Sequence, residues 1–244
     1  MKTFVRPLAV CLLLLVAAST QAANKELHYL QPKSIHPTHL LPLPPSVGSE
    51  EYKSEIDQIL AIQASRTPAQ IKRFQSEEKF GLAAFETVMP AWCTTDNLPK
   101  LDKLLKTAVK ESKYFSGLAK DSFQRKRPYW EDSRIQPLGQ REEECAYPSG
   151  HATRGILYAM ILAQLEPTRG DKLLERGREI GWDRVIGGVH HPSDIAAGRV
   201  LGQAIVRVLL KNPDFQADLK EVQEEYQGFK SSHARHPPTP VLSN

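Results

Sequence analysis

The sequence predicts an all-α fold, a compact helical bundle packed around two central helices. Alternating β-branched runs bounded by turn residues, which signal strands, are essentially absent. Several segments instead carry apolar residues at the spacing of an amphipathic helix, and two of them, residues 152–166 and 193–210, are apolar enough to lie at the centre. With 41% hydrophobic and 25% charged residues among 244, the chain is expected to form one domain with a sizeable core.

The first 23 residues are predicted to be a signal peptide that is not part of this domain. Lys2 and Arg6 form a positively charged start, residues 8–18 form an apolar run, and "STQAA" supplies small residues for cleavage. The apolar run is short for a bilayer span. The mature chain is therefore predicted to be periplasmic or secreted.

The mature chain carries no predicted membrane span, because no later segment is long and apolar enough. Loss of the leader reduces the formal net charge from +4 to +2, since two positive residues leave with it. A surplus this small does not favour a nucleic-acid polymer as partner.

Two cysteines, Cys93 and Cys145, remain in the mature chain; Cys11 lies in the leader, where lipidation is a weaker alternative. An oxidising compartment favours a disulfide between the two. The bridge would close a loop of roughly 50 residues and contribute about 4 kcal/mol. Two buried free thiols are the alternative.

The predicted domain spans residues 48–230 and follows a proline-rich segment, residues 24–47. Five prolines in that segment disfavour helix, so it is expected to be extended. Ser49 is placed to cap the first helix of the domain. Thr67 is placed to cap a second helix and to form a capping box with Gln70.

Later segments continue the helical pattern. Apolar residues recur at helical spacing over 98–115, and residues 171–182 are also expected to be helical. Residues 152–166 and 193–210 are the central helices named above. The tail, residues 231–244, is polar and proline-rich and is expected to be disordered.

Three polar segments hold the chemically unusual residues: "KDSFQRKRP" (120–128), "PSGH" (148–151) and "DRVIGGVHHPSD" (183–194). Each has an ordinary explanation alone. The basic run could be a solvated face, "PSGH" a capped helix start, and the HxxxD pair a local hydrogen bond. Their occurrence together points to chemistry on a phosphate ester.

The cations in these segments suit the charged oxygens of a phosphate. Lys120, Arg127 and Arg184 can clamp them, because guanidinium is planar, permanently charged and bidentate. The helix start at Ser149 and Gly150 offers backbone N–H groups to an anion, and glycine allows close approach.

The histidines supply a nucleophile and a proton donor. His190 can attack phosphorus if one ring nitrogen is free, and Asp194, four residues later, can hold the other. His151 can protonate the leaving alcohol and later accept a proton from water. This set requires no metal and no cofactor.

The three segments together resemble the signature of the type 2 phosphatidic acid phosphatase (PAP2) superfamily, which also includes vanadium haloperoxidases. The matching positions are Lys120, Arg127 and Pro128 in KxxxxxxRP, residues 148–151 in PSGH, and Arg184, His190 and Asp194 in RxxxxxHxxxD. Within the superfamily the chain is similar to class A bacterial non-specific acid phosphatases over most of residues 29–210, including the proline-rich lead into the first helix at 40–57.

The resemblance implies an all-α periplasmic enzyme that hydrolyses a broad range of small phosphate monoesters without a metal and often forms homodimers. It also implies residue roles. His190 would form a phosphohistidine, His151 would be the general acid and Asp194 would orient His190. The phosphate would be held by Lys120, Arg127 and Arg184, with help from Ser149 and Gly150.

Two positions depart from the family pattern. Asp183 stands where serine is usual, and its carboxylate is expected to face solvent; competition with phosphate for Arg184 is the alternative. His191 stands where tryptophan is common and is expected to have a packing or surface role, with a substrate contact as the alternative. Both departures affect substrate preference more than catalysis.

Other functions remain open at this point. A vanadium-dependent haloperoxidase would use the same pocket, although such enzymes are usually much larger. A soluble lipid or isoprenoid phosphate phosphatase, or a phosphate-binding protein without activity, would also fit the motifs.

Overall fold

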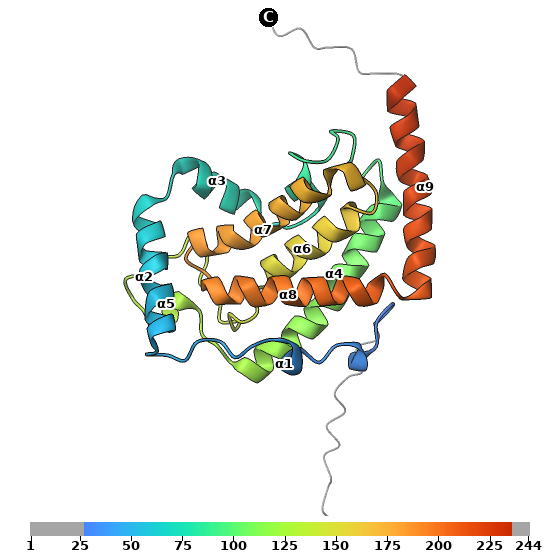
Figure 1. Cartoon of the computed structure of the whole chain (residues 1–244). Helices are drawn as coiled ribbons and strands as arrows, with labels where there is room; N and C mark the ends of the chain where they lie inside the picture. The colour runs from blue at the N-terminus through green and yellow to red at the C-terminus, as the bar shows by residue number, and fades with distance from the viewer. Residues whose placement is uncertain (1–26, 236–244) are drawn as a thin grey trace, which may run out of the picture.

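The computed structural model describes residues 27–235, and within that range it contains helices and no strand (Figure 1). The predicted all-α fold is confirmed. The predicted signal peptide and residues 236–244 of the tail lie outside the described residues.

The longer helices account for most of the described chain. They are α2 (Glu50–Ser65), α3 (Pro68–Ser76), α4 (Pro99–Phe123), α6 (Gly150–Leu162), α7 (Gly170–Ile186), α8 (Pro192–Leu209) and α9 (Pro213–Arg235). The single-turn helix α1 (Pro37–Leu40) precedes α2, and the single-turn helix α5 (Pro128–Glu131) lies between α4 and α6. Helix α1 interrupts the proline-rich segment that was expected to be extended, because proline is well tolerated in the first turn of a helix.

Both predicted caps are present. The Ser49 hydroxyl accepts a hydrogen bond from the backbone N–H of Tyr52 at the start of α2. Thr67 and Gln70 form the reciprocal capping box of α3, with both bonds in place. These starts follow from local chemistry alone, because the cap side chain and the N–H groups that it satisfies lie within one turn.

Helix α6 lies at the centre of the fold, between α7 and α8 and in contact with α4 (Figure 1). Gly155 on α6 and Gly177 on α7 allow the close approach of these two helices: a Cβ on Gly155 would lie 2.6 Å from the carbonyl oxygen of Gly177. The predicted central position of the 152–166 segment is therefore confirmed, and the 193–210 segment packs directly against it.

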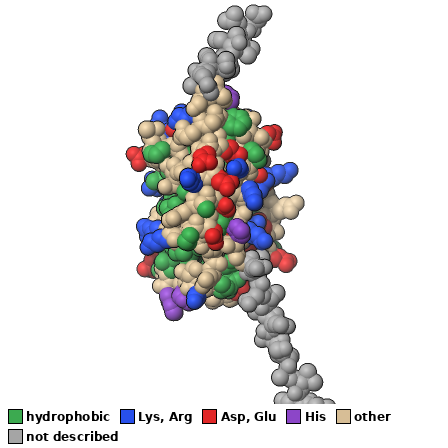
Figure 2. All heavy atoms as spheres, turned by 90° about the vertical axis from the view of Figure 1, so that its right-hand side faces the viewer, with side chains coloured by type: hydrophobic (Ala, Val, Ile, Leu, Met, Phe, Trp, Pro, Cys, Tyr) green, Lys and Arg blue, Asp and Glu red, His purple; other side chains and the backbone are tan. Residues whose placement is uncertain are grey.

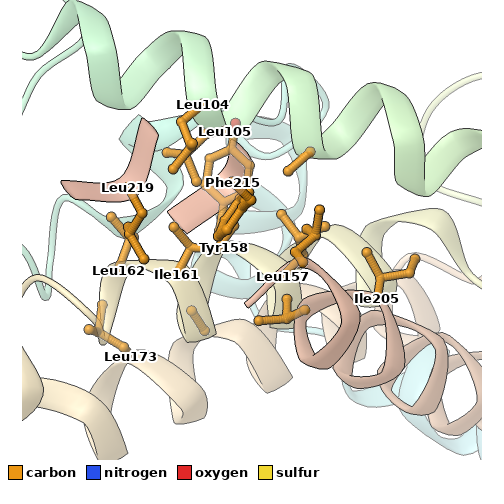
Figure 3. Close-up of a cluster of buried hydrophobic side chains, with 14 of the residues drawn as sticks. Leu104, Leu105, Leu157, Tyr158, Ile161, Leu162, Leu173, Ile205, Phe215 and Leu219 are labelled. Atoms are coloured by element: carbon orange, nitrogen blue, oxygen red, sulfur yellow. The ribbon is translucent and has the colours of Figure 1, made fainter. Parts of the chain in front are cut away.

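Side chains from five helices meet in the core (Figure 3). They come from α4 (Leu104, Leu105), α6 (Leu157, Tyr158, Ile161, Leu162), α7 (Leu173), α8 (Ile205) and α9 (Phe215, Leu219). Burial of these apolar surfaces is the main driving force that holds the bundle together.

Helix α9 contradicts part of the predicted disordered tail. It continues to Arg235, five residues into the 231–244 segment. Residues 231–235 contain no proline, so a helix that is already formed can propagate through them. The prolines of the tail begin at Pro237, outside the described residues.

The predicted disulfide is wrong, because both cysteines of the described chain are free thiols. Cys93 lies just before the start of α4, whereas the Cys145 thiol lies 3.8 Å from Gln124 Oε1 at the end of that helix. Twenty-five helical residues span about 37 Å. A disulfide requires Cα atoms within about 7 Å.

The surface carries both signs of charge. Figure 2 shows the side of the molecule that α9 covers, where acidic and basic side chains are intermixed and apolar ones are scattered among them. Among the described residues, no helix is both long and apolar enough to cross a membrane.

Candidate active site

The residues predicted to act on a phosphate ester meet at one cavity of about 600 Å³. Helix ends build it: the last turns of α4 and α7, the first turn of α6, and the connections that follow α4 and α7. Six predicted residues line the cavity: Lys120, Arg127, Gly150, His151, Arg184 and His190. Ser149 and Asp194 are fully buried behind its wall.

The His190 ring is held at both nitrogens. Its Nδ1 lies 3.2 Å from Asp194 Oδ2, and its Nε2 lies 2.9 Å from Arg127 Nη1. A carboxylate accepts and a guanidinium only donates, so Nδ1 carries the hydrogen and Nε2 keeps its lone pair. Burial, then the charge of Arg127, lowers the pKa of His190 well below its usual value. The ring is therefore neutral, with its basic Nε2 directed at Arg127, and both residues line the cavity.

Asp194 is bound from several sides at the start of α8. Its Oδ1 accepts from Arg125 at 2.6 Å, and its Oδ2 accepts from the backbone N–H of His191 at 2.8 Å as well as facing the His190 ring. Burial alone would raise the pKa of Asp194, but the hydrogen bonds from both histidines outweigh it and hold the pKa well below its usual value. The carboxylate therefore stays ionised behind His190.

Arg125 is a site residue that the sequence analysis did not identify, since a basic run usually marks a solvated face. It is buried and binds three side chains: Asp194, Ser193 Oγ at 2.6 Å and Glu55 Oε2 at 2.7 Å. The only sequence signal is the position of Glu55 on α2, three residues after Tyr52 and on the same buried face.

His191 is fully buried and does not line the cavity, so the expected packing role is correct and the substrate contact is not supported. Its Nδ1 lies 3.3 Å from Asp194 Oδ2. Its Nε2 lies 3.4 Å from Glu131 Oε2, without hydrogen-bond geometry. Burial opposes the charged ring, but Asp194 outweighs this effect and raises the pKa of His191. This shift favours the charged form of the imidazole, which carries the same sign as Arg125 on the other side of Asp194.

Asp183 does not face solvent, contrary to the expectation. It is fully buried, and both carboxylate oxygens accept from Arg73 on α3, each at 2.6 Å. The bidentate pair satisfies this carboxylate without Arg184. Arg184 itself is buried at the cavity, and its Nη1 has no hydrogen-bond partner in the described part of the chain. Arg184 thus has a buried N–H donor that no group of the described chain satisfies.

Two glycines shape the turn between Arg184 and His190. Gly188 has φ of 68°, a left-handed conformation that favours glycine. A Cβ on Gly187 would collide with the ring of Phe74, and the Arg184 guanidinium lies over that ring at 3.7 Å from its centre. The turn therefore lets one short segment contribute both a cation and a histidine to the cavity.

His151 stands in the first turn of α6. Its Nε2 lies 3.3 Å from the carbonyl oxygen of Glu77, and its Nδ1 lies 3.2 Å from Arg154 Nη2. The carbonyl accepts and the guanidinium donates, so Nε2 carries the hydrogen. Burial, then the charges of Arg184 and Arg154, lowers the pKa of His151 well below its usual value. Without a ligand, the ring is neutral.

Ser149 caps α6 and does not face the cavity. Its Oγ accepts from the backbone N–H of Ala152 at 3.4 Å, and its own backbone N–H donates to the carbonyl oxygen of Asp194 at 2.9 Å. Ser149 therefore joins the starts of α6 and α8, and the wall position belongs to Gly150.

Lys120 and Arg127 form a cationic clamp at the cavity, and two carboxylates that the sequence analysis did not single out are paired with it. Glu144 Oε2 lies 2.9 Å from Lys120 Nζ and 3.7 Å from Arg127, and Glu142 forms an ion pair with Arg127. The two cations are buried, whereas the side chains of Glu142 and Glu144 are 58% and 66% exposed. The carboxylates can therefore turn out to solvent when another anion binds.

The segment that contains the motif residues of the cavity is similar to a known family. Residues 104–218, which contain all six of the cavity-lining motif residues, match the family model of the PAP2 superfamily. Among solved structures, a transmembrane PAP2 type phosphatidylglycerolphosphate phosphatase from Bacillus subtilis is similar with a TM-score of 0.44 and 15% identity, over 78% of this chain and 91% of that one.

Curated relatives match a larger part of the chain. The non-specific acid phosphatase of Providencia stuartii is 29% identical over 217 residues, which cover 84% of this chain and 87% of that protein. The non-specific acid phosphatase of Salmonella typhi is 28% identical, over 87% and 88% of the two chains. An acid phosphatase of Zymomonas mobilis is 34% identical over 59% and 56%. The chain therefore contains a PAP2 superfamily domain and is homologous to non-specific acid phosphatases over most of its length.

Proposed function

We propose that this chain is a periplasmic or secreted acid phosphatase that hydrolyses a broad range of small phosphate monoesters through a phosphohistidine, without a metal. The observation that carries the proposal is the His190 ring, whose basic Nε2 lies at a cavity lined by cations while Asp194 holds Nδ1. Homology to acid phosphatases supports the same reaction class.

The first step is attack on phosphorus. The substrate phosphate replaces the Glu142 and Glu144 carboxylates at Lys120 and Arg127, and Arg127 releases the His190 lone pair. Nε2 then attacks phosphorus, a P–N bond forms, and the P–O bond to the alcohol breaks. Asp194 stabilises the positive charge that develops on the imidazole. The cations stabilise the charge on the equatorial oxygens.

His151 moves the protons. A bound phosphate dianion offsets the charges of Arg184 and Arg154, which favours the protonated imidazole. His151 then donates its proton to the departing alcohol oxygen. In the second step it takes a proton from water as the water oxygen attacks phosphorus, and the P–N bond breaks. Phosphate leaves, and His190 is again neutral.

The proposed activity predicts an acidic pH optimum. His190 must be neutral to attack, and its lowered pKa keeps it neutral below pH 6.5. His151 must be protonated to donate, so activity is lost as the pH rises through the pKa of His151. Because this pKa is lowered, the loss occurs at a lower pH than it would with an ordinary histidine. We expect kcat/KM for p-nitrophenyl phosphate to peak below pH 6.5 in the mature chain.

The assay is run in excess EDTA and then with vanadate, a phosphate mimic. Full activity in EDTA and inhibition by vanadate are expected. Loss of activity in EDTA would contradict metal independence, and an optimum above pH 7.5 would contradict the histidine assignment. Oxidation of halide in the presence of vanadate and peroxide would instead indicate a haloperoxidase.

The two clamp carboxylates are expected to weaken substrate binding. Changing Glu142 and Glu144 together to Gln removes the negative charges that compete with phosphate for Arg127 and Lys120. Exposed ion pairs are worth about 0.2–1 kcal/mol each. KM for p-nitrophenyl phosphate should therefore fall about two- to tenfold, as measured by steady-state kinetics.

Glu143→Gln is the matched control, because Glu143 lies between the two, is exposed, and does not line the cavity. Its KM should equal that of the wild type. An unchanged or higher KM in the Glu142→Gln, Glu144→Gln double variant would show that the carboxylates do not compete with substrate.

A further inference from the structure

Arg154 lies between two cavities. It stands on α6 one turn after His151 and lines the catalytic cavity. It also lines a second cavity, of about 490 Å³, formed by α4, α6 and the segment around residues 78–82. Glu78 and Lys113 line both cavities as well. The cavities are therefore adjacent, and a ligand that extends from the first past Arg154 reaches the second.

Arg154 is a largely buried cation without an ion-pair partner among the described residues. Its Nη2 lies 3.2 Å from His151 Nδ1, its guanidinium lies 5.5 Å from the centre of the Phe80 ring, and its Nε has no hydrogen-bond partner there. Burial lowers the pKa of Arg154, yet arginine remains charged at any physiological pH. A buried charge without a counter-ion is costly, and an anion at this place would relieve the cost.

The wall of the second cavity adds positive charge. Lys106, Lys110 and Lys113 follow one another at four- and three-residue spacing, which places them on one face of α4. Asp102 forms an ion pair with Lys106 at 2.6 Å, so the positive charge of the other two lysines remains. Glu78 is the opposing carboxylate at the boundary, and its exposed side chain can turn to solvent.

We propose that Arg154 and Lys113 form a second anion subsite, which binds a further phosphate group on the alcohol part of the substrate. This inference rests on the proposed phosphatase function. The transferred phosphate lies at His190, and the leaving oxygen must lie near His151, the proton donor. Arg154 contacts His151, so the next anionic group of the leaving alcohol lies within reach of Arg154. Sugar bisphosphates are the substrate class that this geometry favours over sugar monophosphates.

The experiment compares kcat/KM for fructose 1,6-bisphosphate with that for fructose 6-phosphate. The wild-type ratio should exceed two, the value expected from two equivalent phosphates. Lys113→Gln should lower the ratio about two- to fivefold, as for an exposed ion pair. Arg154→Gln should lower it about tenfold, as for a charged hydrogen bond. The ratio cancels any change at His151, because both esters need the same proton donor.

Lys103→Gln is the matched control: Lys103 is an exposed lysine on the same helix that lines neither cavity. Both esters should be hydrolysed by this variant as by the wild type. Equal losses for the two esters in Arg154→Gln would place Arg154 at the transferred phosphate and overturn the subsite. A wild-type ratio of two or less would overturn it as well.

If the phosphatase proposal is wrong, neither ester will be hydrolysed, and this result differs from both outcomes above. In that case calorimetric titration still tests the subsite. Fructose 1,6-bisphosphate should bind more tightly than fructose 6-phosphate to the wild type, and the difference should shrink in Lys113→Gln. Equal binding of the two sugars would overturn the inference.

Discussion

Replacing His190 with alanine is expected to lower kcat for p-nitrophenyl phosphate by about 10⁴-fold or more, because loss of a nucleophile leaves only binding and electrostatic contributions to catalysis. The wild type should accumulate an acid-labile, base-stable phosphoenzyme that rapid quenching can trap. The variant should form none. Among the described residues that line the cavity, no other histidine has one ring nitrogen bound to a carboxylate and the other left to attack phosphorus.

Phosphate binding separates this effect from misfolding. Lys120, Arg127 and Arg184 remain in His190→Ala, so inorganic phosphate should still bind when measured by calorimetry. His39→Ala is the control, because His39 is exposed on α1, away from the cavity lining. Activity within tenfold of the wild type in His190→Ala would exclude the phosphohistidine mechanism.

The second large effect is expected for Asp194→Asn. An amide can present its N–H to Nδ1 and hold the His190 ring in the wrong tautomer, and it cannot balance the charge of a phosphorylated imidazole. The corresponding change in a serine protease triad lowers kcat by about 10⁴-fold, and we expect a loss of about 10³- to 10⁴-fold here. The buried Arg125 would keep only Glu55 as its ion-pair partner, so unfolding should require about 3 kcal/mol less.

Glu111→Gln tests whether the loss of activity merely follows the loss of stability. Glu111 is a buried carboxylate of α4 that accepts three backbone N–H groups, from residues 28–30, and it does not line the cavity. This variant should also be destabilised in urea denaturation but should keep its kcat. An Asp194→Asn variant with near-normal kcat would show that Asp194 has only a structural role.

Local sequence patterns predicted most of the helices. Apolar periodicity and the caps at Ser49 and Thr67 act within a few residues, so they can be read without knowledge of packing. The ends of helices were less predictable. Helix α7 continues four residues beyond the predicted 171–182. This extension depends on the packing of α3 against α7, because Asp183 pairs with Arg73 and Arg184 lies over the ring of Phe74.

Part of the cavity could also be predicted, because some of its contacts join residues that are close in the sequence. The HxxxD spacing places Asp194 one helical turn from His190, and the structure has this contact. The neighbours of these residues could not be predicted in this way. The partners of Asp183 and Arg125 are Arg73 and Glu55, 110 and 70 residues away, and the clamp carboxylates belong to a connection without periodicity.

The amino-acid sequence by itself determined the all-α class, the central helix α6 and the identity of six residues that line the cavity. Tertiary structure alone decided that the two thiols stay apart, that Asp183 is buried against Arg73, and that glutamates occupy the clamp before a ligand arrives. The physical reason is range. Capping and helical periodicity act over one turn, whereas ion pairs between buried side chains depend on which helix faces pack together, and this packing is a property of the whole core.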